Sequence, residues 1–167
     1  MLSAGPFSGK LHGKIGKHLP ICPVKGFSIT ARIIDPSLAP TCGVADENSP
    51  VAASVMGENL RIASSAVFDG FNLRKSEADF YQILSFAHEM LPGVADYDRA
   101  LRWSGLRPMT PSSVPLIGRS RLANMAINTG HGHLGWTLAC GSAQLVADVI
   151  FSRKTGIDIA PYQRTLM

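Results

Sequence analysis

The sequence predicts a mixed α/β fold, in which strands and helices alternate along a chain of domain size. Three observations support this prediction. The middle of the chain reads as short alternating strands joined by tight turns, and one amphipathic helix at residues 76–91 interrupts them. A strand, a glycine-rich turn and a second helix follow toward the C-terminal end. That last unit is typical of the sheet-and-helix folds that bind nucleotides.

Alternation of apolar and polar residues predicts the strands. Residues 51–56 and 60–67 are expected to form two strands, with Gly57-Glu58-Asn59 as the hairpin loop. Residues 23–34 are expected to form a strand with one better buried face. That face carries Lys25, Phe27, Ile29, Ala31 and Ile33.

Shorter strands are expected over residues 100–106, after Pro115, and over 125–128. The first of these places Leu101 and Trp103 on one face, because side chains alternate along a strand.

Helix signals are strongest in two places. Ser76 and Asp79 resemble a capping box that opens the helix at 76–91, and Pro92-Gly93 ends it. A second helix is expected to open at Gly135 or Trp136 and to run to about Ser152. Its inner stripe is expected to consist of Leu138, Leu145, Val149 and Ile150.

Composition limits the class of protein. The chain has 167 residues, of which 46% are hydrophobic and 17% are charged, so one globular domain with a real core is expected. No apolar run approaches the roughly 18 residues that a membrane span needs, and the first residues lack the apolar region of a signal peptide. Three cysteines without a C-x-x-C pattern predict a reducing compartment, the cytoplasm, and argue against a disulfide framework or a structural zinc site.

The net charge is +4, and four lysines precede Asp35. No aromatic residues interleave with these lysines: Lys10, Lys14, Lys17 and Lys25. We therefore interpret them as a solvated basic face and expect no nucleic-acid partner.

The glycine-rich turn contains Gly130, Gly132 and Gly135 ahead of the predicted helix. Unpaired N–H groups at a helix start favour an anion, or a flavin ring edge that gains negative charge on reduction. The alternative is a tight strand-to-helix turn with no ligand. The spacing of these glycines matches the G-x-G-x-x-G fingerprint of dinucleotide-binding sites. Such sites also have an acidic residue about 20 positions later, at the end of the next strand, whereas here Asp148 falls inside the predicted helix.

Arg107 is followed by Pro108, which biases its backbone toward extended conformations. A guanidinium held in this way can bind a carboxylate through two parallel hydrogen bonds, and the alternative is a structural salt bridge. His131 and His133 lie two residues apart without an evident third ligand, so no metal site is predicted, and packing or a hydrogen bond near a cofactor is expected instead.

Blocks along nearly the whole chain form a recognisable set. They are A-G-P-F-S at 4–8, P-V-K-G-F-S at 23–28, the segment 61–72 ending in G-F-N, G-L-R-P-M-T-P at 105–111 with P-x-I-G at 115–118, and N-T-G-H-G-x-L-G-W-T-x-A-C-G-S at 128–142. This set resembles the C-terminal part of bacterial D-amino acid dehydrogenases. These enzymes belong to the FAD-dependent family of D-amino acid oxidases and glycine oxidases.

The resemblance implies that FAD takes hydride on N5 from the α-carbon of an amino acid, after which the imine hydrolyses to a 2-oxo acid and ammonia. Arg107 matches the arginine that binds the substrate carboxylate. No side chain is proposed as a base acting at the α-carbon. The family's electron acceptor is a respiratory component in dehydrogenases and oxygen in oxidases. A respiratory acceptor implies a peripheral position at the inner membrane. The residues that match the flavin-binding segments are Ala4, Gly5, Gly130, His131, Gly132, Leu134, Gly135, Trp136 and Thr137.

The family's N-terminal βαβ unit, with its glycine fingerprint, has no counterpart in this sequence. The expected fold is therefore the C-terminal part of a FAD-binding oxidoreductase with an antiparallel substrate-domain sheet. Residues 1–22 would be the tail of the FAD-binding domain, 23–97 the substrate domain, and 98–167 a returning FAD-binding segment. A partner chain could supply the missing half. One alternative is a truncated, non-catalytic fragment, and another is a glycine- or sarcosine-type amine oxidase.

The blocks depart from the family pattern at a few positions. Val67 replaces a usual acid, Phe7 a tryptophan and His133 a threonine, while Ser112-Ser113 stand where Asp-Gly is common. These departures leave substrate specificity open.

Overall fold

A computed structural model describes residues 1–16, 18–46, 49–122 and 124–163. The chain folds as two compact units. Unit 1 comprises residues 1–24 and 107–167, and unit 2 comprises residues 25–106. The model confirms the predicted mixed α/β class with an antiparallel sheet. No helix in the described residues is long and apolar enough to cross a bilayer.

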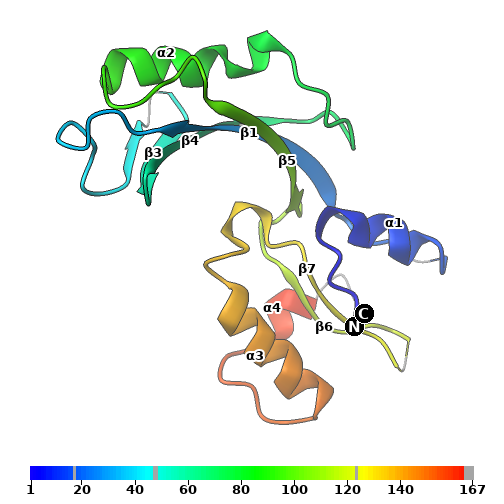
Figure 1. Ribbon diagram of the computed structural model, residues 1–167. Coiled ribbons are helices and arrows are strands. Elements are labelled where there is room, and N and C mark those ends of the chain that lie inside the picture. Colours follow the sequence, from blue (N-terminus) through cyan, green and yellow to red (C-terminus); the bar gives the residue numbers. More distant parts are fainter. Residues whose placement is uncertain (17, 47–48, 123, 164–167) are drawn as a thin grey trace. The chain divides into compact units, whose positions relative to one another are not determined.

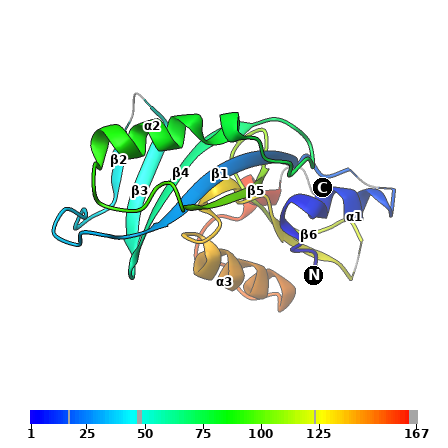
Figure 2. The same ribbon diagram turned by 45° about the horizontal axis from the view of Figure 1, so that its top comes forward.

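A five-stranded sheet is the scaffold of unit 2, in the order β2-β3-β4-β1-β5 (Figure 1; β2 is labelled in Figure 2). Antiparallel pairing joins β2 to β3, β3 to β4 and β4 to β1. Its strands are β1 (Cys22–Arg32), β2 (Val44–Asp46), β3 (Val51–Met56), β4 (Asn59–Val67) and β5 (Leu101–Met109). The predicted hairpin between β3 and β4 is confirmed, and Gly57 takes a φ of +63° there, which favours glycine.

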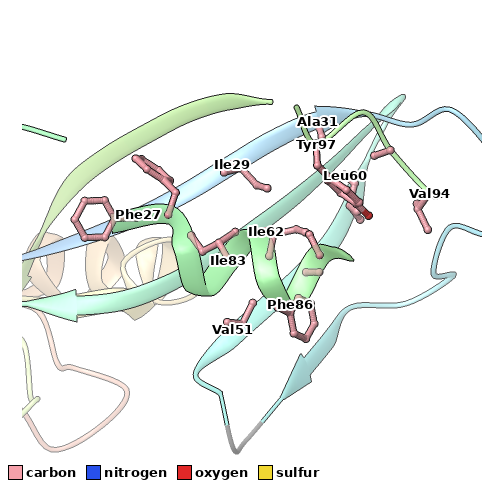
Figure 3. Packing of buried hydrophobic residues seen from close by; sticks show 14 residues of the cluster. Phe27, Ile29, Ala31, Val51, Leu60, Ile62, Ile83, Phe86, Val94 and Tyr97 are labelled. Carbon is pink, nitrogen blue, oxygen red and sulfur yellow. The ribbon is translucent and has the colours of Figure 1, made fainter. Parts of the chain in front are cut away.

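Helix α2 (Tyr81–Met90) packs on one face of this sheet (Figure 2). A 3-10 turn over Glu77–Phe80 precedes it, and the predicted capping box is confirmed because the Ser76 N–H donates to the Asp79 carboxylate at 2.7 Å. The core lies between helix and sheet, and Phe27 meets Phe80 edge-to-face at 5.6 Å between ring centroids. Figure 3 shows this cluster, whose labelled members are Phe27, Ile29, Ala31, Val51, Leu60, Ile62, Ile83, Phe86, Val94 and Tyr97.

A buried cation secures the edge of this core. Lys25 lies on the same strand face as Phe27, as predicted, and its side chain is 5% exposed. Its ammonium donates to Asp69 at 2.9 Å and to the carbonyl of Arg74 at 3.2 Å. The register between β1 and β4 shifts between Lys25 and Phe27, so an irregularity of the strand pair lies beside this clamp.

Unit 1 is built around the antiparallel pair β6 (Leu116–Arg119) and β7 (Ala126–Thr129). Leu2 adds a single parallel bridge to Ile127 on β7. The other elements are α1 (Ser8–Gly13), α3 (Ala139–Ile150) and α4 (Ala160–Gln163). Two small hydrophobic clusters hold the unit together, one around Leu2, Leu19, Leu116 and Ile127, the other around Ile117, Ala126 and Val146.

The structure corrects two predictions about the second helix. It begins at Ala139 rather than at Gly135 or Trp136, since a 3-10 turn over Gly132–Leu134 and further turns fill the interval. The predicted inner stripe is right only in part. Leu145 packs against the cluster around Val146, but Ile150 is exposed, and Leu138 and Val149 are only partly buried. The buried residues are Ser142, Val146 and Asp148. Two of these are polar, and a search for apolar periodicity overlooks such positions.

The boundaries of other elements also differ from expectation. Strand β5 continues past residue 106 and includes Arg107 and Pro108. The three-residue strand β2 and the one-turn helix α4 carry too few residues to produce a periodic signal.

Candidate functional site

Two segments more than 120 residues apart meet in unit 1, and both contain residues predicted to bind a cofactor. One is the turn that begins at Ala4 and Gly5, and the other follows β7. The Thr129 hydroxyl donates to the Gly5 carbonyl at 3.2 Å and lies 3.0 Å from the hydroxyl of Ser8. Since the Thr129 proton goes to the carbonyl, Ser8 supplies the proton of the second bond. Both hydroxyl residues are almost completely buried.

Sequence reasoning did not single out Ser8 or Thr129 as site residues, although both lie inside the quoted blocks. Their contribution is indirect. Gly5 has a φ of +52°, and the bond from Thr129 to its carbonyl fixes that turn beside the end of β7. A small hydroxyl residue immediately before Gly130 was the available signal.

The turn after β7 depends on its glycines for packing. Gly130 and Gly132 have φ values of +81° and +56°. A Cβ at Gly130 would lie 2.7 Å from Cγ2 of Thr110, and one at Gly132 would lie 2.8 Å from Sδ of Met109. These glycines therefore allow the turn to approach the chain at Met109 and Thr110. Gly135 has ordinary space, with its nearest contact at 3.7 Å.

The packing of Met109 against the turn at Gly132 also locates Arg107 with respect to that turn. Arg107 and Met109 are two residues apart on β5 and share a strand face, with Cα atoms about 7 Å apart in extended chain. Met109 contacts the position of Gly132 on that same turn. Arg107 is partly buried, and this desolvation lowers the pKa of its guanidinium, which still stays charged because an arginine side chain does not deprotonate in proteins.

Three residues of unit 1 carry buried polar atoms without a hydrogen-bond partner in the described part of the chain. They are Nε2 of His131, Oδ1 of Asn128 and both ring nitrogens of His12. An unsatisfied buried polar atom costs about 1–3 kcal/mol, so each is a place where a ligand can add a bond. Burial lowers the pKa of His131 below its ordinary 6.5, which favours the neutral imidazole at pH 7. His131 was predicted to be near a cofactor; Asn128 and His12 were not.

The rest of the predicted flavin segment is more open. Leu134 is 45% exposed, Trp136 is 94% exposed and Thr137 is exposed. Because α3 begins only at Ala139, the segment 130–137 is a turn and not the first turn of a long helix. Any N–H groups that it offers to an anion come from this irregular backbone. Within the described residues, no group of three or more histidine, cysteine or acidic side chains could hold a metal ion.

Comparison with known proteins gives consistent matches. Residues 1–149 match the protein family described as FAD dependent oxidoreductase. The chain is 46% identical over 158 residues to a protein named D-amino acid dehydrogenase 2 from Mesorhizobium japonicum, and 42% identical over 156 residues to a D-amino acid dehydrogenase from Xanthobacter autotrophicus. These alignments cover 95% and 93% of this chain but only 38% and 37% of the relatives.

A solved structure supports the same relationship. Glycine oxidase from Geobacillus kaustophilus superposes with a TM-score of 0.82 at 26% identity, covering 98% of this chain and 43% of the oxidase. The chain thus spans less than half the length of each of these three proteins.

Proposed function

We propose, from the premise that this chain belongs to the family of FAD-dependent oxidoreductases, that it forms part of the active centre of an enzyme that oxidises D-amino acids to 2-oxo acids and ammonia. Relatives at 46% and 42% identity carry the name D-amino acid dehydrogenase. Because the chain spans 38% of the first of these, we assign the activity to a larger assembly, with the remaining FAD-binding half on the same or a partner chain.

The observation that carries the proposal is the pairing of two glycine turns in unit 1. The Ser8–Thr129 hydroxyl pair, with its bond to Gly5, holds the N-terminal turn beside the turn at Gly130. The unsatisfied Nε2 of His131 lies on the second turn. A flavin offers ring nitrogens and carbonyl oxygens that suit such backbone and imidazole partners. The residues that would hold FAD are therefore Ala4, Gly5, Gly130, His131, Gly132 and the segment 134–137.

The chain's own residues would bind and orient. Arg107 would bind the substrate carboxylate through two parallel N–H···O bonds and so fix the direction of the α-carbon. Neutral His131 would donate or accept one hydrogen bond without adding charge. Bound FAD would accept hydride from that carbon. We assign no side-chain base.

Two measurements test this proposal. The purified chain is titrated with FAD while flavin absorbance and melting temperature are followed, and D-alanine is then added without oxygen. The same measurements are repeated after co-expression with the portion of the Mesorhizobium relative that this chain does not match. Flavin binding and bleaching by D-alanine in either preparation support the proposal. Colourless protein in both would identify a non-catalytic fragment.

A second candidate substrate class has a specific observation in its favour, namely the match to glycine oxidase with a TM-score of 0.82. Rates with D-alanine, glycine and sarcosine in the complemented preparation decide between the two classes. Reoxidation by oxygen or by a quinone analogue decides the acceptor. Co-sedimentation with inner-membrane vesicles tests the peripheral membrane position that a respiratory acceptor implies.

A further inference from the structure

The two faces of the unit 2 sheet differ in chemistry. The side chains of Phe27, Ile29 and Ile62 point into the core that α2 covers. Their neighbours along the same strands point to the opposite face, because side chains alternate. On that face β4 places Arg61 in register with Thr30 of β1 and with Ser54 of β3.

Arg61 is partly buried and held on two sides. Its Nη2 donates to Oγ of Ser28 at 3.0 Å, and Ser28 is 1% exposed. The guanidinium carbon lies 5.5 Å from the centre of the Trp103 ring. A hydrogen bond to a buried hydroxyl and an aromatic neighbour fix the direction of a planar cation.

Trp103 packs against Gly105 and is still open to solvent. Its indole lies over the backbone of Gly105, where a Cβ would come within 2.0 Å of Cη2 of the ring. Any larger residue at 105 would displace the ring. The tryptophan nevertheless remains 51% exposed.

In the part of the chain that the structure describes, Arg61 is held in place without an anionic partner. Four other cations of unit 2 each contact a carboxylate within 4.0 Å, in the pairs Lys25–Asp69, Arg32–Glu58, Arg99–Asp96 and Arg102–Glu77. Among the described residues, Arg61 has no carboxylate within that distance. One hydroxyl oxygen occupies one of its five N–H donors and leaves its charge uncompensated.

We infer that Arg61, oriented by Ser28 and Trp103, is a binding site for the carboxylate of a small organic acid. A planar fork of donors matches a carboxylate in a way that a lysine ammonium cannot. Ser28, Arg61 and Trp103 all belong to unit 2. Small acids such as glutarate and D-glutamate carry the group that this site would bind.

The fluorescence of Trp103 makes the site measurable without flavin or activity. The chain contains two tryptophans, so Trp136→Phe leaves Trp103 as the only one. This variant is titrated with D-glutamate, with glutarate and with uncharged glutaramide. We expect a saturable change in emission with the two acids and none with glutaramide.

Substitutions in the same background then identify the residue. Arg61→Gln should raise the apparent Kd for glutarate about tenfold or more, and Arg61→Lys should raise it less because it keeps the charge. The matched control is Arg32→Gln, which removes the same charge from the same sheet at a residue already paired with Glu58, and its Kd should stay within twofold. Circular dichroism checks that each variant is folded. If Arg61→Gln does not fold, the Kd of the folded Arg61→Lys variant becomes the deciding measurement.

Absence of a saturable change with glutarate, an equal response to glutaramide, or an unchanged Kd in the folded Arg61 variants would overturn the site. These outcomes are independent of flavin binding. A chain that binds glutarate but never binds FAD keeps the Arg61 site and loses the proposed oxidoreductase. A chain that binds FAD but does not bind glutarate keeps the proposed oxidoreductase and loses the Arg61 site.

Discussion

The two units of this chain satisfy their interiors in different ways. Unit 2 has one continuous hydrophobic core between α2 and the sheet, and its buried cation Lys25 has an anionic partner. Unit 1 has two small clusters, and buried polar atoms on His12, Asn128 and His131 lack partners in the described part of the chain. This difference indicates that the interior of unit 2 is satisfied without a ligand, whereas the interior of unit 1 has polar groups that a ligand or another segment would satisfy.

The largest expected effect tests the scaffold. Phe80→Ala should lower the free energy of unfolding by about 3–5 kcal/mol, because the ring is fully buried against Phe27 and its loss leaves a cavity. Chemical denaturation measures the change. The neighbouring Tyr81→Ala is the control, since Tyr81 is 74% exposed and should change stability by at most about 0.5 kcal/mol. Equal effects of the two variants would contradict a core centred on Phe80.

In unit 1 the expected effect depends on hydrogen bonds. Thr129→Val keeps the shape of the side chain but leaves the Ser8 hydroxyl and the Gly5 carbonyl without this partner, and should cost about 1–3 kcal/mol. It should also weaken FAD binding, because the two glycine turns are no longer tied together. Thr129→Ser restores the hydroxyl and should recover most of both losses. Recovery of stability without recovery of FAD binding would show that the hydroxyl pair does not position the cofactor turns.

Arg107 gives a prediction on substrate binding rather than on stability. Arg107→Lys keeps the charge but loses the planar fork, and should weaken binding of a D-amino acid by about 1–3 kcal/mol in the flavin-containing preparation. The apparent KM and a competitive carboxylate inhibitor both measure this change. An unchanged affinity would remove Arg107 from the role of carboxylate ligand.

The contrast between the units also explains what the sequence could predict. The family resemblance and the mixed α/β class are confirmed, and so are the β3–β4 hairpin and the capping box at Ser76. Each of these depends on local signals, such as alternation along a strand or a carboxylate three residues after a serine. Such signals are strong in unit 2, where a continuous apolar face must be buried.

Unit 1 resisted prediction because its important features are not local. The start of α3 was misplaced because Gly135 and Trp136 looked like a helix opening, while the backbone there continues as turns. Burial of Ser142 and Asp148 depends on the packing of α3 against β6 and β7, which are distant from these residues along the chain. The Ser8–Thr129 pair joins residues 121 positions apart, and no periodicity in the sequence announces such a contact.

The smallest expected effect concerns pH and the clamp in unit 2. The hydrogen bond from Lys25 lowers the pKa of Asp69 below its ordinary 3.8. A carboxyl whose pKa is lower in the folded state stabilises the fold at pH values above its unfolded pKa, and this contribution is lost as the pH falls through the folded value. Stability should therefore decline below about pH 4 with a contribution from Asp69.

Asp69→Asn should flatten that part of the profile and lower stability at pH 7, since the buried ammonium loses its counter-charge. Asp98→Asn is a suitable reference, because Asp98 is an exposed acid of the same unit, and denaturation midpoints between pH 2.5 and 7 measure both variants. If the two variants gave the same profile, the Lys25–Asp69 pair would contribute nothing specific to stability, and the interior of unit 2 would differ from that of unit 1 in its hydrophobic core alone.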